Sequence, residues 1–164
     1  MKIRPATEKD LEAINNIYNQ VIPYEMSTAD MEPYTMDERI QWFNSCDRSG
    51  YPVFVAETGN DIAGYIFFSP YRPRRLALRY TAELSYFLDE KYRQKGIGSL
   101  LMDHALKEAP SYSFKTLIAI LLAHNVASIR LLEKFGFREW GRLPGVADFN
   151  GKERDQLFYG RKIN

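Results

Sequence analysis

The sequence predicts an α/β fold of the α+β type, in which helices and strands share one hydrophobic core. Short apolar segments bounded by turn residues, typical of strands, alternate with segments whose apolar residues recur at helical spacing. The chain has 164 residues, of which 45% are hydrophobic, and this is enough to bury one sizeable core. We therefore expect residues 1–164 to form a single domain.

The N-terminal part predicts a strand, a helix and a loop. Residues 2–4 are expected to form a short first strand, and residues 7–10, Thr-Glu-Lys-Asp, resemble a capping box that starts a helix. The apolar stripe of this helix continues until Pro23 ends it. Residues 24–34 have no clear period, which predicts a loop.

A second helix and a hairpin follow. Residues 35–38 form another capping box, which begins a helix with Ile40 and Phe43 on its inner side. Residues 51–57 and 61–69 are predicted to be two strands, and the Thr-Gly-Asn segment at 58–60 is a plausible hairpin turn between them. These two strands are therefore predicted to pair antiparallel.

The stretch 82–99 combines a strand, a loop and the start of a helix. Gly96 and Gly98 stand at the helix start, where backbone N–H groups have no partner within the helix. Glycine lets a ligand approach the backbone closely, and Arg93 and Lys95 add positive charge. The stretch therefore predicts a site for a pyrophosphate.

The rest of the chain adds three strands and one helix. Residues 116–123 predict a strand, and residues 125–136 a helix that begins at an asparagine cap and stops at a glycine. Further strands are predicted over 137–141 and 157–161, with a loop and turn over 144–152 between them.

Composition excludes several functional classes. The 22 basic and 21 acidic residues nearly cancel, so no global field favours nucleic acid or an anionic membrane. The longest apolar run, residues 117–123, is far below the ~20 residues of a membrane span. The N-terminus has no apolar core of a signal peptide, and Cys46 has no disulfide partner, so we expect a cytoplasmic protein. With only His104 and His124 and no cysteine cluster, we expect no metal site.

The glycine loop does not fit the common nucleotide motifs. A Walker A loop needs Lys-Ser or Lys-Thr after its last glycine, where Ser99 stands, and a dinucleotide fingerprint needs a third glycine in place of Leu101. The pattern Arg93-x-x-Gly96-x-Gly98 after a strand instead resembles the acetyl-coenzyme A loop of the GNAT superfamily of N-acetyltransferases. A helix that starts Asn-x-x-Ser at 125–128 and closes on Gly-Phe at 136–137 is similar to a second motif of that family.

Within the family, the resemblance extends over nearly the whole chain to the branch that acetylates phosphinothricin and methionine sulfoximine. The residues that carry it are at 17–19, 50–52, 81–83, 139–141 and 149–152. The resemblance implies a mixed, mostly antiparallel twisted sheet of six or seven strands with helices on both faces. It also implies a homodimer, and a pair of neighbouring strands that splay apart so that the pantetheine arm of acetyl-coenzyme A fits between them.

The resemblance further implies which residues bind acetyl-coenzyme A. They comprise the strand that precedes the glycine loop, the loop itself, and the first turn of the later helix. A backbone N–H of the strand is implied to stabilise the oxyanion of the thioester carbonyl, with no metal involved. The residues are Tyr86, Phe87, Leu88, Arg93, Gln94, Lys95, Gly96, Ile97, Gly98, Ser99, Asn125 and Ser128.

Three residues are implied to serve the acceptor amine. Glu83 is the candidate general base, because a strand carboxylate between Ala82 and Leu84 has its pKa raised by desolvation. Arg75 stands eight residues earlier, where the family places an arginine that binds an acidic group of the substrate. Tyr34 belongs to the loop that lies over the acceptor. The alternative for Glu83 is a structural ion pair with Arg75 or Arg79.

The sequence departs from the branch at two positions. Leu78 stands three residues after Arg75, where the branch usually has a tyrosine. The missing hydroxyl bears on whether the acceptor is the usual one of the branch. Leu132 stands at the position where many family members have a tyrosine that protonates the leaving thiolate. The proton must therefore come from water or from another tyrosine such as Tyr34, or the thiolate is released unprotonated. We expect an N-acetyltransferase for a small amino-acid-like amine, and the alternatives are acetylation of a protein N-terminus or polyamine, or a non-catalytic acyl-coenzyme A sensor.

Overall fold

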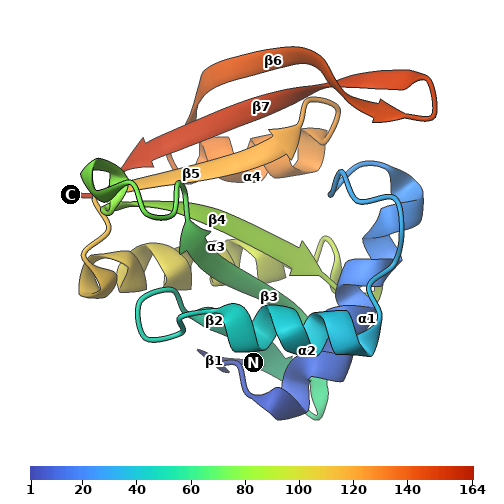
Figure 1. Cartoon of the computed structure of the whole chain (residues 1–164). Coiled ribbons are helices and arrows are strands. Elements are labelled where there is room, and N and C mark those ends of the chain that lie inside the picture. Colours follow the sequence, from blue (N-terminus) through green and yellow to red (C-terminus); the bar gives the residue numbers. More distant parts are fainter.

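The computed structural model describes all 164 residues as one seven-stranded sheet with four α-helices (Figure 1). The strands are β1 (Lys2–Pro5), β2 (Val53–Thr58), β3 (Asp61–Pro70), β4 (Thr81–Leu88), β5 (Thr116–Leu122), β6 (Arg138–Phe149) and β7 (Lys152–Lys162). The helices are α1 (Leu11–Val21), α2 (Met36–Ser45), α3 (Ile97–Glu108) and α4 (Val126–Lys134). None of these helices has the length and apolarity that crossing a membrane demands.

The sheet has the order β1-β2-β3-β4-β5-β7-β6 and is antiparallel except between β4 and β5. Parallel neighbours need a crossover, and α3 supplies it between these two strands. The predicted mixed, mostly antiparallel sheet is confirmed.

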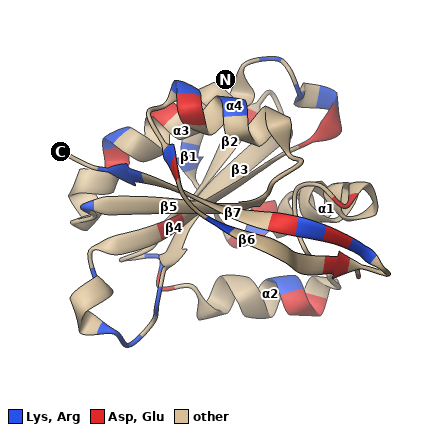
Figure 2. Ribbon diagram, turned by 90° about the horizontal axis from the view of Figure 1, so that it is seen from above, with Lys and Arg blue, Asp and Glu red and all other residues tan.

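Two hydrophobic cores lie on the two faces of the sheet. In β2, Val53 and Val55 pack with α1 and α2, whereas Phe54 and Ala56 belong to the larger core under α3 and α4. This alternation follows from side chains pointing to opposite faces along a strand. Figure 2 shows α3 and α4 on one side of the strands and α1 and α2 on the other.

Both predicted capping boxes are present. Thr35 Oγ1 accepts from the Glu38 N–H at 3.2 Å, and the Thr35 N–H donates to Glu38 Oε2 at 2.8 Å. Thr7 and Asp10 form the other box, which opens a 3-10 turn over Glu8–Asp10 that leads into α1.

The inner face of α2 differs from the prediction. Phe43 is buried, but Ile40 is 41% exposed, so its predicted inner position is wrong. Arg39 is buried in its place, four residues before Phe43 and therefore on the same side of the helix. The apolar pattern could not indicate this, because a charged residue takes the core position.

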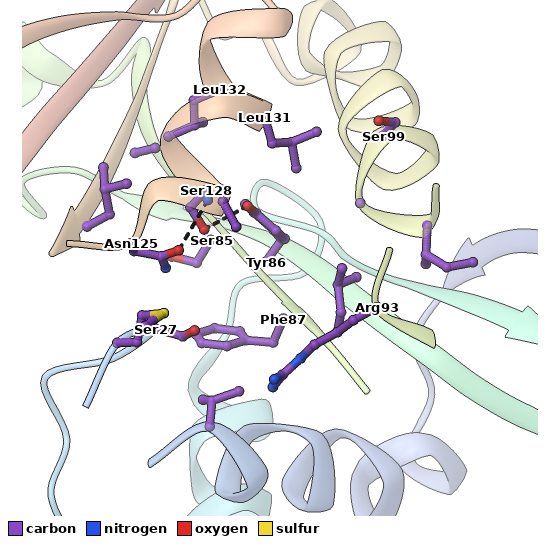
Figure 3. Close-up of a pocket in the computed structure, with 18 of the residues that line it drawn as sticks. Ser27, Ser85, Tyr86, Phe87, Arg93, Ser99, Asn125, Ser128, Leu131 and Leu132 are labelled. Carbon is purple, nitrogen blue, oxygen red and sulfur yellow. Dashed lines mark hydrogen bonds between the residues drawn. The ribbon is translucent and has the colours of Figure 1, made fainter. Parts of the chain in front are cut away.

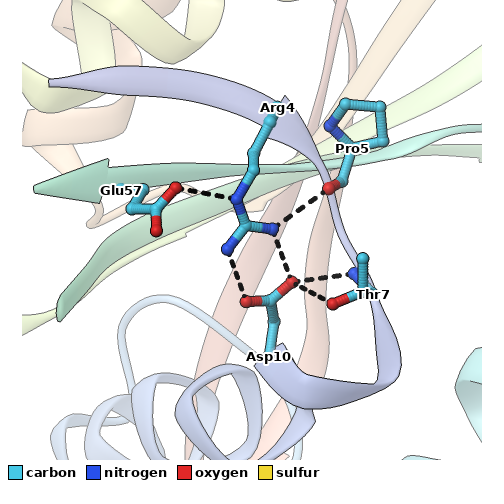
Figure 4. A network of polar contacts seen from close by, with 5 residues as sticks. All are labelled: Arg4, Pro5, Thr7, Asp10 and Glu57. Atoms are coloured by element: carbon cyan, nitrogen blue, oxygen red, sulfur yellow. Dashed lines mark hydrogen bonds and ion pairs between the residues drawn. The ribbon is translucent and has the colours of Figure 1, made fainter. Parts of the chain in front are cut away.

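An ion network fixes the first strand to its neighbours (Figure 4). Arg4 donates from Nη1 and Nη2 to the two oxygens of Asp10, each at 2.8 Å, and from Nε to Glu57 Oε2 at 2.8 Å. The Thr7 N–H donates to Asp10 Oδ2 at 2.7 Å. One guanidinium thus connects β1, β2 and the start of α1.

The predicted loop over 144–152 is wrong. Its residues up to Phe149 belong to β6, and β7 begins at Lys152, so that only Asn150 and Gly151 form the turn, both with positive φ. Pro144 is accommodated because β6 is the edge strand and its pairing with β7 shifts between Leu143 and Ala147.

Candidate active site

The parallel pair β4–β5 separates part-way along its length. The two strands are paired at Thr81–Thr116, Ala82–Leu117 and Glu83–Ile118, and at no later position. Beyond this point β4 stays paired with β3 as far as Leu88, and β5 stays paired with β7 as far as Leu122. A gap therefore opens inside the sheet, and backbone N–H and C=O groups on its two sides lack strand partners.

A cleft of about 410 Å³ occupies this gap (Figure 3). Residues 84–88 of β4 and 119–121 of β5 form its two sides, and the first turns of α3 and α4 form its ends. Val21, the last residue of α1, and Met26 and Ser27 in the chain that follows also border it. A narrow ligand with its own amide groups would fit such a gap, since it could satisfy the free strand groups.

The N-terminus of α3 opens onto the cleft. Gly96 caps it in the left-handed conformation, with φ of +81°, and the first intrahelical bond is donated by the Leu100 N–H to Gly96 O at 3.1 Å. The N–H groups of residues 97–99 precede this bond, so they are free for an anion. A Cβ on Gly98 would lie 3.1 Å from Leu131 Cδ2, so this glycine also allows α3 and α4 to approach.

Positive charge surrounds this helix end. Arg93 lines the cleft, and its guanidinium lies 5.6 Å from the Tyr24 ring centroid. Lys134 reaches across from α4 and donates to Ser99 Oγ at 3.0 Å. Lys95 is exposed and does not line the cleft; its ammonium lies 5.3 Å from the Tyr92 ring centroid. The other predicted cofactor-binding residues all line the cleft.

Asn125 and Ser128 form the first turn of α4. Asn125 is buried and caps the helix, because its Oδ1 accepts from the Ser128 N–H at 3.1 Å. Ser128 Oγ accepts a hydrogen bond at 2.9 Å from the hydroxyl of Tyr86 on β4 (Figure 3). This contact bridges the cleft from β4 to α4.

Glu83 lies at the last pair before the strands separate. Its neighbours Ala82 and Leu84 are in the core under α3 and α4, so the alternation of the strand directs Glu83 to the α1 and α2 side. Burial raises the pKa of the Glu83 carboxyl, and the positive charge of Arg72 partly opposes this. The alternative of an ion pair with Arg75 or Arg79 is wrong, because Glu83 makes no salt bridge.

Arg75 and Tyr34 do not line the cleft between the strands. Arg75 is exposed and borders a second cleft, of about 530 Å³, that Arg72, Arg74 and Arg79 also line. Tyr34 packs against Tyr18, and burial raises its pKa. The structure therefore does not bring Arg75 or Tyr34 together with the residues that line the first cleft.

The sequence analysis missed Met26 and Ser27, which line the cleft from the segment predicted only as a loop. No periodicity marks them. Their position depends on long-range contacts: the Tyr18 hydroxyl shares a hydrogen bond with Thr28 Oγ1 at 2.7 Å, and the His124 ring Nε2 lies 2.7 Å from Glu25 O.

Comparison with known proteins decides the family. Residues 12–137 match the model of the Acetyltransferase (GNAT) family. The chain belongs to the GNAT acetyltransferases. This membership makes it an acyltransferase enzyme, and the predicted resemblance is confirmed.

Several relatives of this GNAT enzyme are similar over most or all of their length. YwnH of Bacillus subtilis, whose name assigns it provisionally to the phosphinothricin acetyltransferases, is 42% identical, with 100% of both chains covered. The L-methionine sulfoximine/L-methionine sulfone acetyltransferase of Salmonella typhimurium is 30% identical, over 96% of this chain and 92% of the relative. The crystal structure of a GNAT superfamily phosphinothricin acetyltransferase from Sinorhizobium meliloti, in complex with acetyl-coenzyme A, superposes with a TM-score of 0.93. It is 27% identical, and the match covers 99% of this chain and 88% of that one.

Proposed function

We propose that this GNAT enzyme transfers the acetyl group of acetyl-coenzyme A to the amine of a small amino-acid-like acceptor, of the phosphinothricin or methionine sulfoximine type. The observation that carries the proposal is the separation of β4 from β5 directly beside the free N-terminus of α3. A diphosphate on the helix end and a pantetheine arm between the strands would satisfy both sets of unpaired backbone groups.

The chain's own groups support the chemistry. An amine with a pKa near ~9 to 10 must lose a proton before it attacks, and Glu83, with its raised pKa and no ion-pair partner, is our candidate base, directly or through a water. Acetyl-coenzyme A supplies an activated thioester. A free N–H of the separated part of β4, within residues 86–88, would stabilise the oxyanion that forms on its carbonyl.

The acceptor is proposed to carry an acidic group. The loop between β3 and β4 presents Arg72, Arg74, Arg75 and Arg79 around one cleft, so it would attract a carboxylate or phosphinate and repel a polyamine. Arg75 is our candidate for the bidentate contact, because it is exposed and its guanidinium makes no hydrogen bond or salt bridge within the chain. Similarity to acetyltransferases named for methionine sulfoximine and phosphinothricin supports the same class.

The test combines binding and turnover. Calorimetry with acetyl-coenzyme A should give saturable heat, and addition of phosphinothricin or methionine sulfoximine should release free thiol, followed with a thiol reagent. A polyamine and a peptide with a free N-terminus are the comparison acceptors. Absence of binding would overturn the proposal, and binding without turnover on any acceptor would point to a sensor of acyl-coenzyme A instead.

A further inference from the structure

The leaving group of an acetyl transfer from a thioester is a thiolate, and the reaction is easier if a proton reaches the sulfur as the bond breaks. Leu132 of α4 lines the cleft and is buried, and its side chain has no proton to give. The proton must therefore come from another side chain or from water, or the thiolate leaves unprotonated.

Tyr86 is the only side chain lining the cleft that can donate a proton and be left as a stable conjugate base. The other lining residues are aliphatic residues, glycines, serines, amides, Met26, Phe87 and Arg93, and an arginine guanidinium does not act as a proton donor to a thiolate in proteins. Tyr34, the other candidate, does not line the cleft.

The Tyr86 hydroxyl also lies in the right place relative to α4. It is 2.9 Å from Ser128 Oγ. Ser128 and Leu132 are four residues apart, so they share one face of the helix, and a long side chain at 132 would extend back over the turn that holds Ser128. A phenol from β4 thus occupies the region that a phenol from position 132 would reach.

We propose that Tyr86 is the general acid of the reaction, and this rests on the proposed acetyl-coenzyme A function. As the acceptor nitrogen bonds to the acetyl carbon, the C–S bond breaks and its electron pair goes to sulfur, which takes the proton of Tyr86 Oη. The proton lost by the amine goes to Glu83 or its water. Tyr86 then recovers a proton through Ser128, which lies next to the exposed residues Val126 and Ala127.

The protonation state of Tyr86 suits this role. Burial raises the pKa of its hydroxyl, and the hydrogen bond with Ser128 opposes this, so that Tyr86 stays protonated at neutral pH. The same hydrogen bond holds the ring across the cleft between Gly98 and α4, since Tyr86 Cε2 lies 3.9 Å from where a Cβ on Gly98 would be.

The first test is Tyr86→Phe, which removes the hydroxyl and keeps the ring. We expect kcat to fall roughly 100-fold, while the Kd of coenzyme A measured by calorimetry changes less than about threefold. Tyr112→Phe, a half-buried tyrosine of the turn after α3, is the matched control and should keep full activity. The double variant Tyr86→Phe with Leu132→Tyr should have a kcat about tenfold or more above that of Tyr86→Phe alone, because it returns a phenol to the same region.

The second test does not depend on turnover. In the complex with coenzyme A, ultraviolet absorbance reports ionisation of the bound thiol, and a hydrogen bond from Tyr86 should stabilise the thiolate. The bound thiol should therefore ionise at a higher pH in Tyr86→Phe than in wild type. Unchanged kcat together with unchanged thiol ionisation in Tyr86→Phe would overturn the assignment. Failure of the wild type to bind coenzyme A would instead overturn the proposed function itself.

Discussion

Arg39 donates a hydrogen bond from Nε to Asn15 Oδ1 at 3.1 Å, and both side chains are buried between α2 and α1. No carboxylate pairs with this guanidinium. Its central carbon instead lies 4.8, 4.7 and 4.9 Å from the ring centroids of Tyr18, Tyr34 and Trp42. Three aromatic rings and one amide thus compensate a buried positive charge.

Arg39→Leu should therefore lower the free energy of unfolding by about 2–4 kcal/mol, because it removes the cation–π contacts and leaves Asn15 Oδ1 unpaired. Arg39→Lys should cost nearly as much, since an ammonium cannot stack flat between the rings. Urea unfolding measures both, with the exposed Arg130→Leu as control. Full stability of Arg39→Lys would show that the charge alone suffices.

Asp10 should make stability depend on pH. Burial alone would raise the pKa of Asp10, but hydrogen bonds from Arg4 and Thr7 outweigh it, and the net pKa is lowered. The contribution is therefore present above the ordinary aspartate pKa of about 3.9 and is lost as pH falls through the lowered value. At pH 7, Asp10→Asn should cost about 1–3 kcal/mol in urea unfolding.

The difference between Asp10→Asn and wild type should shrink as the pH falls below about 4, because Asp10 of the unfolded chain is then protonated, and folded Asp10 follows at its lower pKa. Asp103→Asn is the matched control, since the Asp103 pair with Lys107 is exposed on α3. A difference that stays constant from pH 7 into this range would contradict the assigned role.

Glu83 should control the acidic side of the rate profile. Its pKa is raised by burial, so kcat/KM should increase with pH through a value above the ordinary glutamate pKa of about 4.3. Glu83→Gln should lower kcat about 100-fold or more and remove this dependence. A Glu83→Gln variant with wild-type kcat at neutral pH would exclude Glu83 as the base.

Arg72 should shift the pH dependence of kcat/KM although it is not the general base. Its positive charge lowers the pKa of Glu83, so Arg72→Ala should move the acidic limb to higher pH. Lys107→Ala, which removes a positive charge on the far part of α3, should leave the limb where it is. If the acidic limb moved to lower pH in Arg72→Ala, the result would contradict the predicted effect of Arg72 on the pKa of Glu83.

Arg75 should act on the acceptor alone. Arg75→Ala should raise the KM for an amino-acid acceptor roughly 10- to 100-fold and leave the KM for acetyl-coenzyme A unchanged, because the bidentate contact to the acidic group is lost. Arg75→Lys should recover only part of the loss. Steady-state kinetics with a decarboxylated acceptor is the control, and an equal loss on that amine would show that Arg75 does not bind the acidic group.

Much of the fold follows from local chemistry, which the sequence carries directly. The capping boxes at Thr7 and Thr35 and the left-handed Gly96 depend on residues within a few positions of each other. Features that depend on contacts with distant parts of the chain could not be predicted from these local patterns. Arg39 is buried because three rings gather around it, and β6 continues through Pro144 because an edge strand tolerates it.

The candidate site divides in the same way. The glycine loop and the start of α4 are contiguous motifs, and nearly all their predicted residues line one cleft. The position of Ser27 beside that cleft and the contact between Tyr86 and Ser128 join segments far apart in the chain, so neither has a local signal.

The interruption between β4 and β5 also gives this sheet two edges in its interior. Edge strands usually recruit strands of other molecules, which is a route to aggregation. Here the first turns of α3 and α4, Val21 at the end of α1, and Met26 and Ser27 border the gap between both edges. The fold can therefore keep hydrogen-bonding capacity available for a thin ligand while shielding it from a foreign strand.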